Sequence, residues 1–309
     1  MKVMNCWGSE IIDTVCKVME SKEPTWISRI GGTDTSAFGH FRQTGEIRLD
    51  NQLEQLLGYF DKNTSDDTFV RSAHIYEKSL QSSDIITVGN IDWINRIINR
   101  QERTVFDLTG KTCTSFSFIE GIDPFFFAFE RFGQGKKILI ISPFSKSIQY
   151  QTSKYRINRI LNMKNGQKFP DCEFKTYSTP ITYNMNGLES LYFNTKTEGF
   201  SNWIELADKM INDISLIDFD IALIASGIYT MYLGHEIKTT LNKKAIFLGG
   251  MLNPFFNIYS PRYDTDFFNS FQNLDYQISI MEDFGDLTKI NKHLPPNEGP
   301  TNYLLRREN

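Results

Sequence analysis

Residues 219–250 read FDIALIASGIYTMYLGHEIKTTLNKKAIFLGG, and this stretch decides the fold. Two short apolar runs, one over residues 221–225 and one ending at Gly249-Gly250, flank a segment that has the length and spacing of a helix. A strand, a helix and a second strand in this order form a βαβ unit with a parallel sheet. Parallel strands bring the Ser226-Gly227 turn and the Gly249-Gly250 turn to the same edge of the sheet, which is where open α/β folds bind ligands. Backbone N–H groups and a helix N-terminus at that edge favour an anion, so we expect a phosphorylated small molecule there.

The same alternation of strands and helices extends outward from this unit. We predict further strands at residues 25–30, 84–88, 137–141 and 172–177. We predict helices at residues 9–21, 51–60, 70–80, 93–100, 145–161 and 203–214, and a helix that follows Gly31-Gly32 through Ala37 and Phe41. The predicted fold class is therefore α/β and Rossmann-like, with a mostly parallel sheet and helices on both faces. No Pro/Gly/Ser-rich linker divides the chain, so we expect one continuous domain with two lobes, residues 1–135 and 136–309.

Composition excludes several classes of protein. With 40% hydrophobic and 23% charged residues, the chain is globular rather than disordered. A net charge of −4 gives no general attraction to nucleic acid or to anionic lipid. No apolar run approaches membrane-spanning length, and acidic residues come too early for a signal peptide, so we expect a cytoplasmic protein without a membrane span. The cysteines lack metal-ligand spacing and suit a reducing compartment; they are Cys6, Cys16, Cys113 and Cys172.

The first candidate site is the segment from Arg29 to Asp34, which reads RIGGTD. Gly31 and Gly32 after a strand allow a tight turn and the close approach of a ligand to the backbone. Asp34 lies at or just inside a helix N-terminus, where Thr33 or Asp34 has a structural alternative as an N-cap. The functional interpretation is a carboxylate that meets a sugar hydroxyl or a divalent metal carrying a diphosphate. Arg29 would pair with a phosphate or brace Asp34.

Three further turns carry polar groups. At the turn of residues 226–229, Tyr229 is placed to stack on a base or sugar or to pack in the core, and Lys238 farther along is expected to be a solvated helix residue. Ser142 begins the turn SPFSKS, whose hydroxyl and N–H groups would hold a diphosphate, with a plain helix cap at Ser145 as the alternative. Asp92 is a general base or the cap of the helix at residues 93–100.

Several common site patterns do not occur in the sequence. The four histidines show no HExxH or paired spacing, and His235 is expected to be a packing residue within its helix. The chain has no GxSxG elbow, which argues against the common hydrolases. It also lacks a GxGxxG segment after the first strand with an acidic residue about 20 positions on. This absence argues against a dinucleotide-dependent enzyme.

Two of these segments resemble the GT-D fold glycosyltransferases, a family first described from a domain of unknown function in bacterial glycan assembly. The family's N-terminal motif is a strand followed by an R-[FI]-G-D-G-E-like turn, and residues 29–34 stand in that place. Its C-terminal region is similar to Asp220 to Gly227 and to the strand that ends at Gly249-Gly250. The resemblance implies transfer of a sugar from a nucleotide-diphosphate donor, usually a UDP-sugar, to a glycan in surface polysaccharide or glycoprotein assembly.

The resemblance also implies a metal, and here the chain departs from the pattern. In the family a DxE-type pair of carboxylates holds the metal and the donor diphosphate, with Mn²⁺ or Mg²⁺ as the metal. Gly32 stands in place of the first acid and Asp34 in place of the second, so one carboxylate of two remains. Three alternatives stay open: one acid suffices, the metal is held elsewhere, or metal dependence has been lost.

The expected donor-site residues are Arg29, Gly31, Gly32, Thr33, Ser142, Ser226, Gly227, Tyr229, Gly249 and Gly250, with Asp34 as the metal ligand. An inverting reaction also needs a base near the acceptor hydroxyl, for which Asp34, Asp92 and Glu120 are candidates. Two other functions compete. One is a nucleotide-sugar-binding protein that has lost catalysis; the other is a different Rossmann-like nucleotide-dependent enzyme, such as an oxidoreductase or methyltransferase. The sugar, acceptor, anomeric outcome and oligomeric state are open.

Overall fold

The computed structural model describes residues 2–4, 9–47, 58–88, 108, 110–115, 119, 123–162, 168–182, 197–260 and 263–282. Eight strands form one sheet in the order β1-β4-β3-β2-β8-β7-β5-β6, and every neighbouring pair is parallel. The strands are β1 Lys2–Met4, β2 Thr25–Ile30, β3 Ile85–Val88, β4 Thr112–Ser115, β5 Lys137–Ser142, β6 Glu173–Ser178, β7 Ile221–Ile224 and β8 Lys244–Phe247. The α/β class with a parallel sheet is therefore confirmed, and β1 and β4 are strands that the sequence did not predict.

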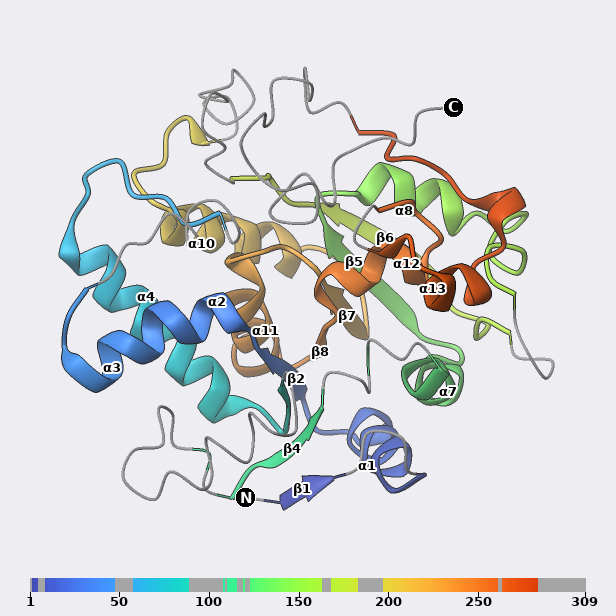
Figure 1. Cartoon of the computed structure of the whole chain (residues 1–309), viewed down its shortest axis with the longest axis horizontal. Coiled ribbons are helices and arrows are strands. Elements are labelled where there is room, and N and C mark those ends of the chain that lie inside the picture. Colours follow the sequence, from blue (N-terminus) through green and yellow to red (C-terminus); the bar gives the residue numbers. More distant parts are fainter. Residues whose placement is uncertain are drawn as a thin grey trace.

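Helices cover both faces of the sheet (Figure 1). On one face lie α4 Asp66–Ser82, α10 Trp203–Ser215 and α11 Tyr229–Thr239. On the other lie α1 Ser9–Glu20, α7 Asp123–Phe132, α8 Ser145–Gln151, α12 Leu252–Phe255 and α13 Asp266–Phe271. The sheet separates two hydrophobic cores, and each core lies under the helices of its own face.

The central strands are apolar throughout because both of their faces are buried. In β7, Ile221 and Leu223 belong to one core, and Ala222 and Ile224 belong to the other. Successive side chains of a strand point to opposite faces, so a parallel strand between two helical layers needs an unbroken apolar run. This explains why the segment at residues 219–250 is so readable in the sequence.

Among the described residues, β8 is the last strand in sequence order, yet it lies in the middle of the sheet between β2 and β7. The segment after β2 turns to the face of α4 and α11, where Ala37 and Phe38 join the core. The segment after β8 turns to the opposite face, where Met251 and Leu252 are buried. Neighbouring strands whose connections leave to opposite sides form the crevice in which open α/β sheets bind their ligands.

Helix α11 packs closely on β2 because it carries a glycine at the contact. A Cβ atom on Gly234 would lie 2.2 Å from Trp26 Cη2, far inside van der Waals contact. Trp26 is fully buried, and its indole Nε1 donates to Ser79 Oγ at 3.0 Å. The glycine thus fixes how near the helix lies to the sheet.

One predicted helix is wrong in length. The helix expected over residues 145–161 ends at Gln151, and turns follow it. The buried Gln151 amide donates to the carbonyl oxygens of Asn257 (3.0 Å) and Tyr276 (2.9 Å). These tertiary hydrogen bonds and the poor helix formers Thr152 and Ser153 end the helix there.

The helix predicted after β2 is present but irregular. It consists of α2 Gly32–Asp34, a π-helical turn Thr35–Gly39, and α3 His40–Thr44. Single π-helical turns often lie at functional sites. The helix predicted at residues 51–60 is wrong at its end, because residues 58–60 are described and are not helical. Its residues 51–57 and the helix predicted at residues 93–100 lie outside the described residues. In the part of the chain that is described, no helix has the length and apolar character needed to cross a membrane.

Candidate functional site

The candidate site lies at the ends of β2 and β8, and Arg29 is its first member. Arg29 is the second-last residue of β2 and is half-buried. Its Cζ atom lies 5.9 Å from the centroid of the Phe247 ring, the last residue of β8. A guanidinium at this distance is attracted by the face of an aromatic ring. The side chain of one strand therefore rests on the end of its neighbour.

Gly249 makes room for this contact. Its φ is +60°, a conformation that an L side chain rarely adopts, and a Cβ there would lie 3.2 Å from Arg29 Nη1 and 3.1 Å from Phe247 Cε2. Gly250 follows in the same 3-10 turn, Gly249–Met251. The predicted glycine turn after β8 thus borders the predicted arginine near the end of β2.

Asp34 is the third member of the site. It is 7% exposed, and its carboxylate lies close to the Gly31 turn, where a Cβ on Gly31 would be 2.4 Å from Asp34 Oδ2. Burial raises the pKa of Asp34 to about 6, while the nearby Arg29 charge and a hydrogen bond to its own backbone act in the opposite direction. Asp34 makes no side-chain capping bond to the π-helical turn that follows it. Strongly perturbed carboxylates of this kind gather at functional sites.

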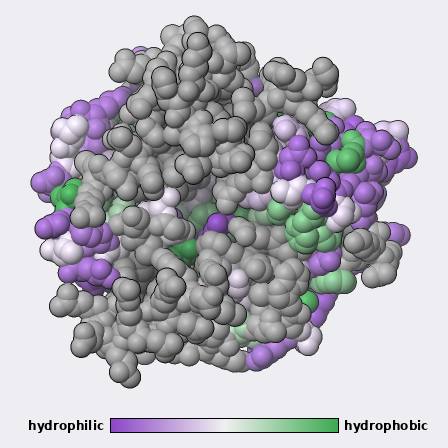
Figure 2. Space-filling view, in the orientation of Figure 1, coloured by the Kyte–Doolittle hydropathy of each residue, from purple (hydrophilic) through white to green (hydrophobic). Residues whose placement is uncertain are grey.

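The surface in this region is mixed. In the space-filling view, hydrophilic and hydrophobic groups of described residues appear side by side near the middle of the face, where Figure 1 draws the start of α2 (Figure 2). Gly32 and Thr33 lie between Arg29 and Asp34 in the sequence and begin α2. The structure thus brings together Arg29 and Asp34 with the glycine turns of both strands.

The Ser226-Gly227 turn lies at the same edge, but its polar groups are used within the protein. The backbone N–H of Ser226 donates to Thr230 Oγ1 at 3.0 Å, and the two hydroxyls lie 3.1 Å apart. Ser226 is 6% exposed. Ser226 therefore ties the turn to its own helix.

Ser142 has a similar role after β5. It is fully buried, and its Oγ accepts from the backbone N–H of Phe144 at 3.2 Å. Farther along the turn, the backbone N–H and the hydroxyl of Ser147 both donate to the Glu282 carboxylate. A carboxylate of the protein itself thus binds where the sequence predicted a diphosphate.

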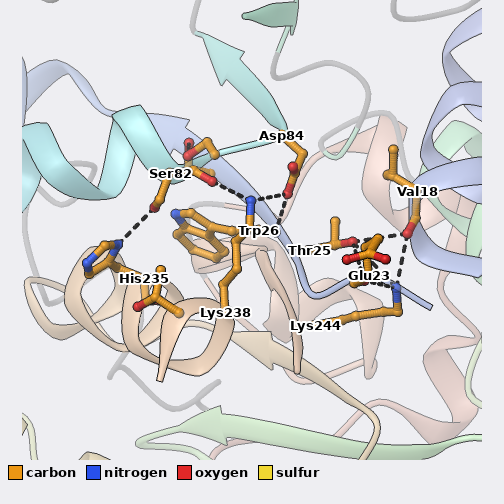
Figure 3. Close-up of polar contacts among 12 residues, drawn as sticks. Val18, Glu23, Thr25, Trp26, Ser82, Asp84, His235, Lys238 and Lys244 are labelled. Carbon is orange, nitrogen blue, oxygen red and sulfur yellow. Dashed lines mark hydrogen bonds and ion pairs between the residues drawn. The ribbon is translucent and has the colours of Figure 1, made fainter. Parts of the chain in front are cut away.

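Two predictions about α11 need correction. Tyr229 does not stand at the surface to stack on a base: it is 1% exposed, packs edge-on against Trp203, and its hydroxyl lies 2.7 Å from Thr182 Oγ1. Lys238 is not a solvated residue: its Nζ donates to Ser82 O at 2.6 Å and to Asp84 Oδ2 at 2.8 Å (Figure 3). Tyr229 and Lys238 therefore have structural roles, the first as a buried ring and the second as a charge with partners in the fold.

Two features of the described residues were not predicted. The sequence predicted Phe247 only as part of an apolar strand, although its position close to the Gly249-Gly250 turn was a signal. Asn253 of α12 is 2% exposed, and its Nδ2 has no hydrogen-bond partner in the described part of the chain. Buried donors without a partner are rare and call for a reason. The predicted residues Asp92 and Glu120 lie outside the described residues.

The described residues offer little to a divalent metal. They contain no group of three or more His, Cys, Asp or Glu side chains that could hold one. Asp34 is the carboxylate of the site, Gly32 has no side chain, and the charge beside Asp34 is the Arg29 guanidinium. Mg²⁺ and Mn²⁺ prefer several oxygen ligands. This donor set does not fit the metal that the resemblance implies.

Comparison with known proteins finds two similar solved structures. Both are of the domain of unknown function 1792, and one is described as having a distinct glycosyltransferase fold. They share 14% and 13% sequence identity with this chain, with a TM-score of 0.46, and each alignment covers 81% of this chain and 79% of the other. No family model and no curated protein matches the sequence.

Proposed function

We propose that this protein is a glycosyltransferase that moves a sugar from a nucleotide-diphosphate donor, UDP-linked, to a glycan acceptor in surface polysaccharide or glycoprotein assembly. The observation that carries the proposal is the nearness of the Arg29 guanidinium to the buried Asp34 carboxylate, beside the paired strands β2 and β8. Sugar transfer needs a cation near the leaving diphosphate and a base near the attacking hydroxyl, both around the same anomeric carbon. A guanidinium suits the first role and a carboxylate suits the second.

The reaction assigns a role to each group. The bond between the anomeric carbon and the diphosphate oxygen breaks, and its electron pair leaves on the diphosphate. Arg29 would stabilise the negative charge that develops there. The acceptor oxygen bonds to the anomeric carbon, and its proton passes to a base. Asp34 is our choice for that base, because a carboxylate with a pKa of about 6 suits proton transfer near neutral pH.

A thermal-shift panel tests the proposal. Nucleotide sugars, a dinucleotide and S-adenosylmethionine are added to wild type, to Asp34→Asn and to Asp171→Asn, an exposed aspartate that serves as the matched control. A ligand at about 100 times its dissociation constant stabilises the fold by about 2.7 kcal/mol. We expect one UDP-sugar to shift wild type and the control.

Donor turnover separates transfer from binding. Release of UDP by wild type and its loss in Asp34→Asn would support a transferase. Binding without turnover, with or without acceptor glycans, would instead mean a nucleotide-sugar-binding protein. A shift only with the dinucleotide or S-adenosylmethionine would refute the proposal in favour of another nucleotide-dependent enzyme.

A further inference from the structure

We infer that the site binds the donor diphosphate without a divalent metal, with Arg29 supplying the positive charge and with Phe247 and Gly249 holding Arg29 in position. This inference rests on the proposed function and concerns the same site. It goes further by naming what neutralises the diphosphate and which residues position that group.

The first step is the mismatch between the donor set and a metal. A metal carrying a diphosphate is usually held by protein carboxylates together with the phosphate oxygens. Here the position of the first acid is Gly32, and the remaining acid, Asp34, has a guanidinium for its charged neighbour. Among the described residues no further His, Cys, Asp or Glu joins Asp34 to complete a three-ligand group. A fixed cation therefore already occupies the electrostatic role that the metal would have.

The second step is the fitness of Arg29 for that role. A guanidinium is planar, stays charged at all physiological pH values and presents five N–H donors whose fork matches a phosphate. Contact with the face of Phe247, 5.9 Å from Cζ to centroid, uses none of these donors. The aromatic ring thus contacts the face of the cation, whereas its N–H donors lie in the guanidinium plane.

The third step is the geometry that permits this contact. Arg29 belongs to β2, while Phe247 ends β8, and the two strands pair through Ile27 and Ile246. The chain then turns at Gly249 with a φ of +60°. A Cβ on that residue would lie 3.2 Å from Arg29 Nη1, tighter than an ordinary contact, so the neighbouring side chain would have to move. Gly249 and Phe247 are therefore positioning residues that act through Arg29.

Titration calorimetry with UDP tests the inference. Binding is measured in EDTA and again with Mn²⁺ or Mg²⁺, on wild type, Arg29→Met, Arg29→Lys, Gly249→Ala and Phe247→Leu. We expect the Kd of wild type to be the same within about twofold in EDTA and in metal. Arg29→Met should raise Kd by about 10-fold or more, the value of a charge-assisted hydrogen bond. Arg29→Lys should fall between, because lysine keeps the charge and loses the fork.

The positioning variants supply a readout that a structural role would not move. Gly249→Ala and Phe247→Leu should weaken UDP while leaving uridine binding within about twofold, because only the diphosphate contacts Arg29. Salt should weaken UDP binding to wild type more than to Arg29→Met. Circular dichroism and thermal melting establish that each variant is folded. If Arg29→Met does not fold, Arg29→Lys still tests the role of Arg29.

The failures are distinguishable. UDP binding that disappears in EDTA and is unchanged in Arg29→Met would overturn the metal-free site while leaving the proposed transferase intact. Metal-free binding that depends on Arg29, without transfer to any glycan, would support the site and count against transfer. No binding of UDP under either condition would overturn both.

Discussion

The two ends of strand β2 bury polar groups in opposite ways. At its beginning, Asp84 Oδ2 accepts from the Trp26 backbone N–H at 2.8 Å and from Lys238 Nζ at 2.8 Å (Figure 3). At its far end, Asp34 is buried so deeply that its pKa rises to about 6 even with Arg29 nearby. The first carboxylate is neutralised by partners within the fold, and the second keeps a cost that the fold does not remove. Such an unfavourable charge is typical of a site that awaits a ligand.

Other groups at the beginning of β2 fit the same description. Lys244 Nζ donates to the carbonyl oxygens of Val18 (3.1 Å) and Glu23 (2.6 Å), and His235 Nδ1 lies 2.9 Å from Ser82 Oγ (Figure 3). Fully partnered polar networks rigidify a fold. We therefore expect substitutions at this end to change stability, and substitutions at the other end to change ligand binding and catalysis.

The largest expected effect is at Asp34. Asp34→Asn should reduce donor turnover by at least about 100-fold, because a general base contributes about 100- to 10,000-fold. Replacement of Asp34 by any neutral isostere without loss of turnover would break the comparison.

The same variant should be more stable than wild type at pH 7.5. The folded pKa of about 6 lies above the ordinary value of 3.8, so the folded protein holds this proton more tightly than the unfolded chain does. Wild-type stability from this group is thus full below the unfolded pKa and is lost as pH rises through about 6. The difference of about 2 units corresponds to as much as about 3 kcal/mol, which Asp34→Asn should recover. Urea unfolding at pH 7.5 and at pH 4 measures it, and the gain should vanish at pH 4.

The next effect is at Gly234, on the structural side of the comparison. Alanine normally stabilises a helix by about 1 kcal/mol relative to glycine. Here the added Cβ would meet the Trp26 ring at 2.2 Å, so Gly234→Ala should instead destabilise the protein by about 1–3 kcal/mol. Denaturant unfolding gives the value, and UDP affinity should stay within about twofold. A more stable Gly234→Ala would show that the helix can shift without cost.

A smaller effect is expected at the Asp84–Lys238 ion pair, whose side chains are 34% and 18% exposed. A double-mutant cycle with Asp84→Asn and Lys238→Met should give a coupling free energy of about 1–2 kcal/mol, since the pair is partly shielded from water. A coupling free energy near zero would mean that Asp84 stabilises the fold through its hydrogen bond with the Trp26 N–H and not through Lys238.

The smallest effect is at His235. Burial lowers the pKa of His235 below its ordinary value of 6.5, so the unfolded chain takes up the proton first as pH falls. Its stabilising contribution is present above pH 6.5 and is lost below it. His235→Gln should remove this part of the pH dependence and change stability at pH 7.5 by less than about 0.5 kcal/mol. Thermal melting from pH 5 to 8 would detect it.

The central strands could be predicted from the sequence, because a strand that is buried on both faces is an unbroken apolar run. Strand β2 begins and ends where it was predicted, at Thr25 and Ile30. The edge strand β1 is only three residues long, and β4 reads TCTS, which carries little apolar signal. Strands that are short or carry little apolar signal are defined by pairing with a neighbour, and one sequence does not show that pairing.

The site was predicted in part for the same reason. Arg29 lies near the end of a strand, and Asp34 and the glycine turns follow strands, so parallel pairing places them at one edge of the sheet. That Ser226 and Tyr229 turn inward depends on Thr230 and Thr182, contacts that local pattern does not encode. The role of Phe247 depends on which strand lies beside β2, which only the sheet order reveals.

The central place of β8 has a consequence for biosynthesis. Strands β1 to β4 and strands β5 to β7 are all made before the residues of β8 leave the ribosome, yet β8 joins β2 to β7. Until then β2 and β7 each present an open, apolar edge, the kind of surface that pairs with other chains. The nascent protein is therefore most exposed to aggregation just before β8 inserts. That insertion also completes the contact between Phe247 and Arg29, so the candidate site forms in the same step that joins β2 to β7.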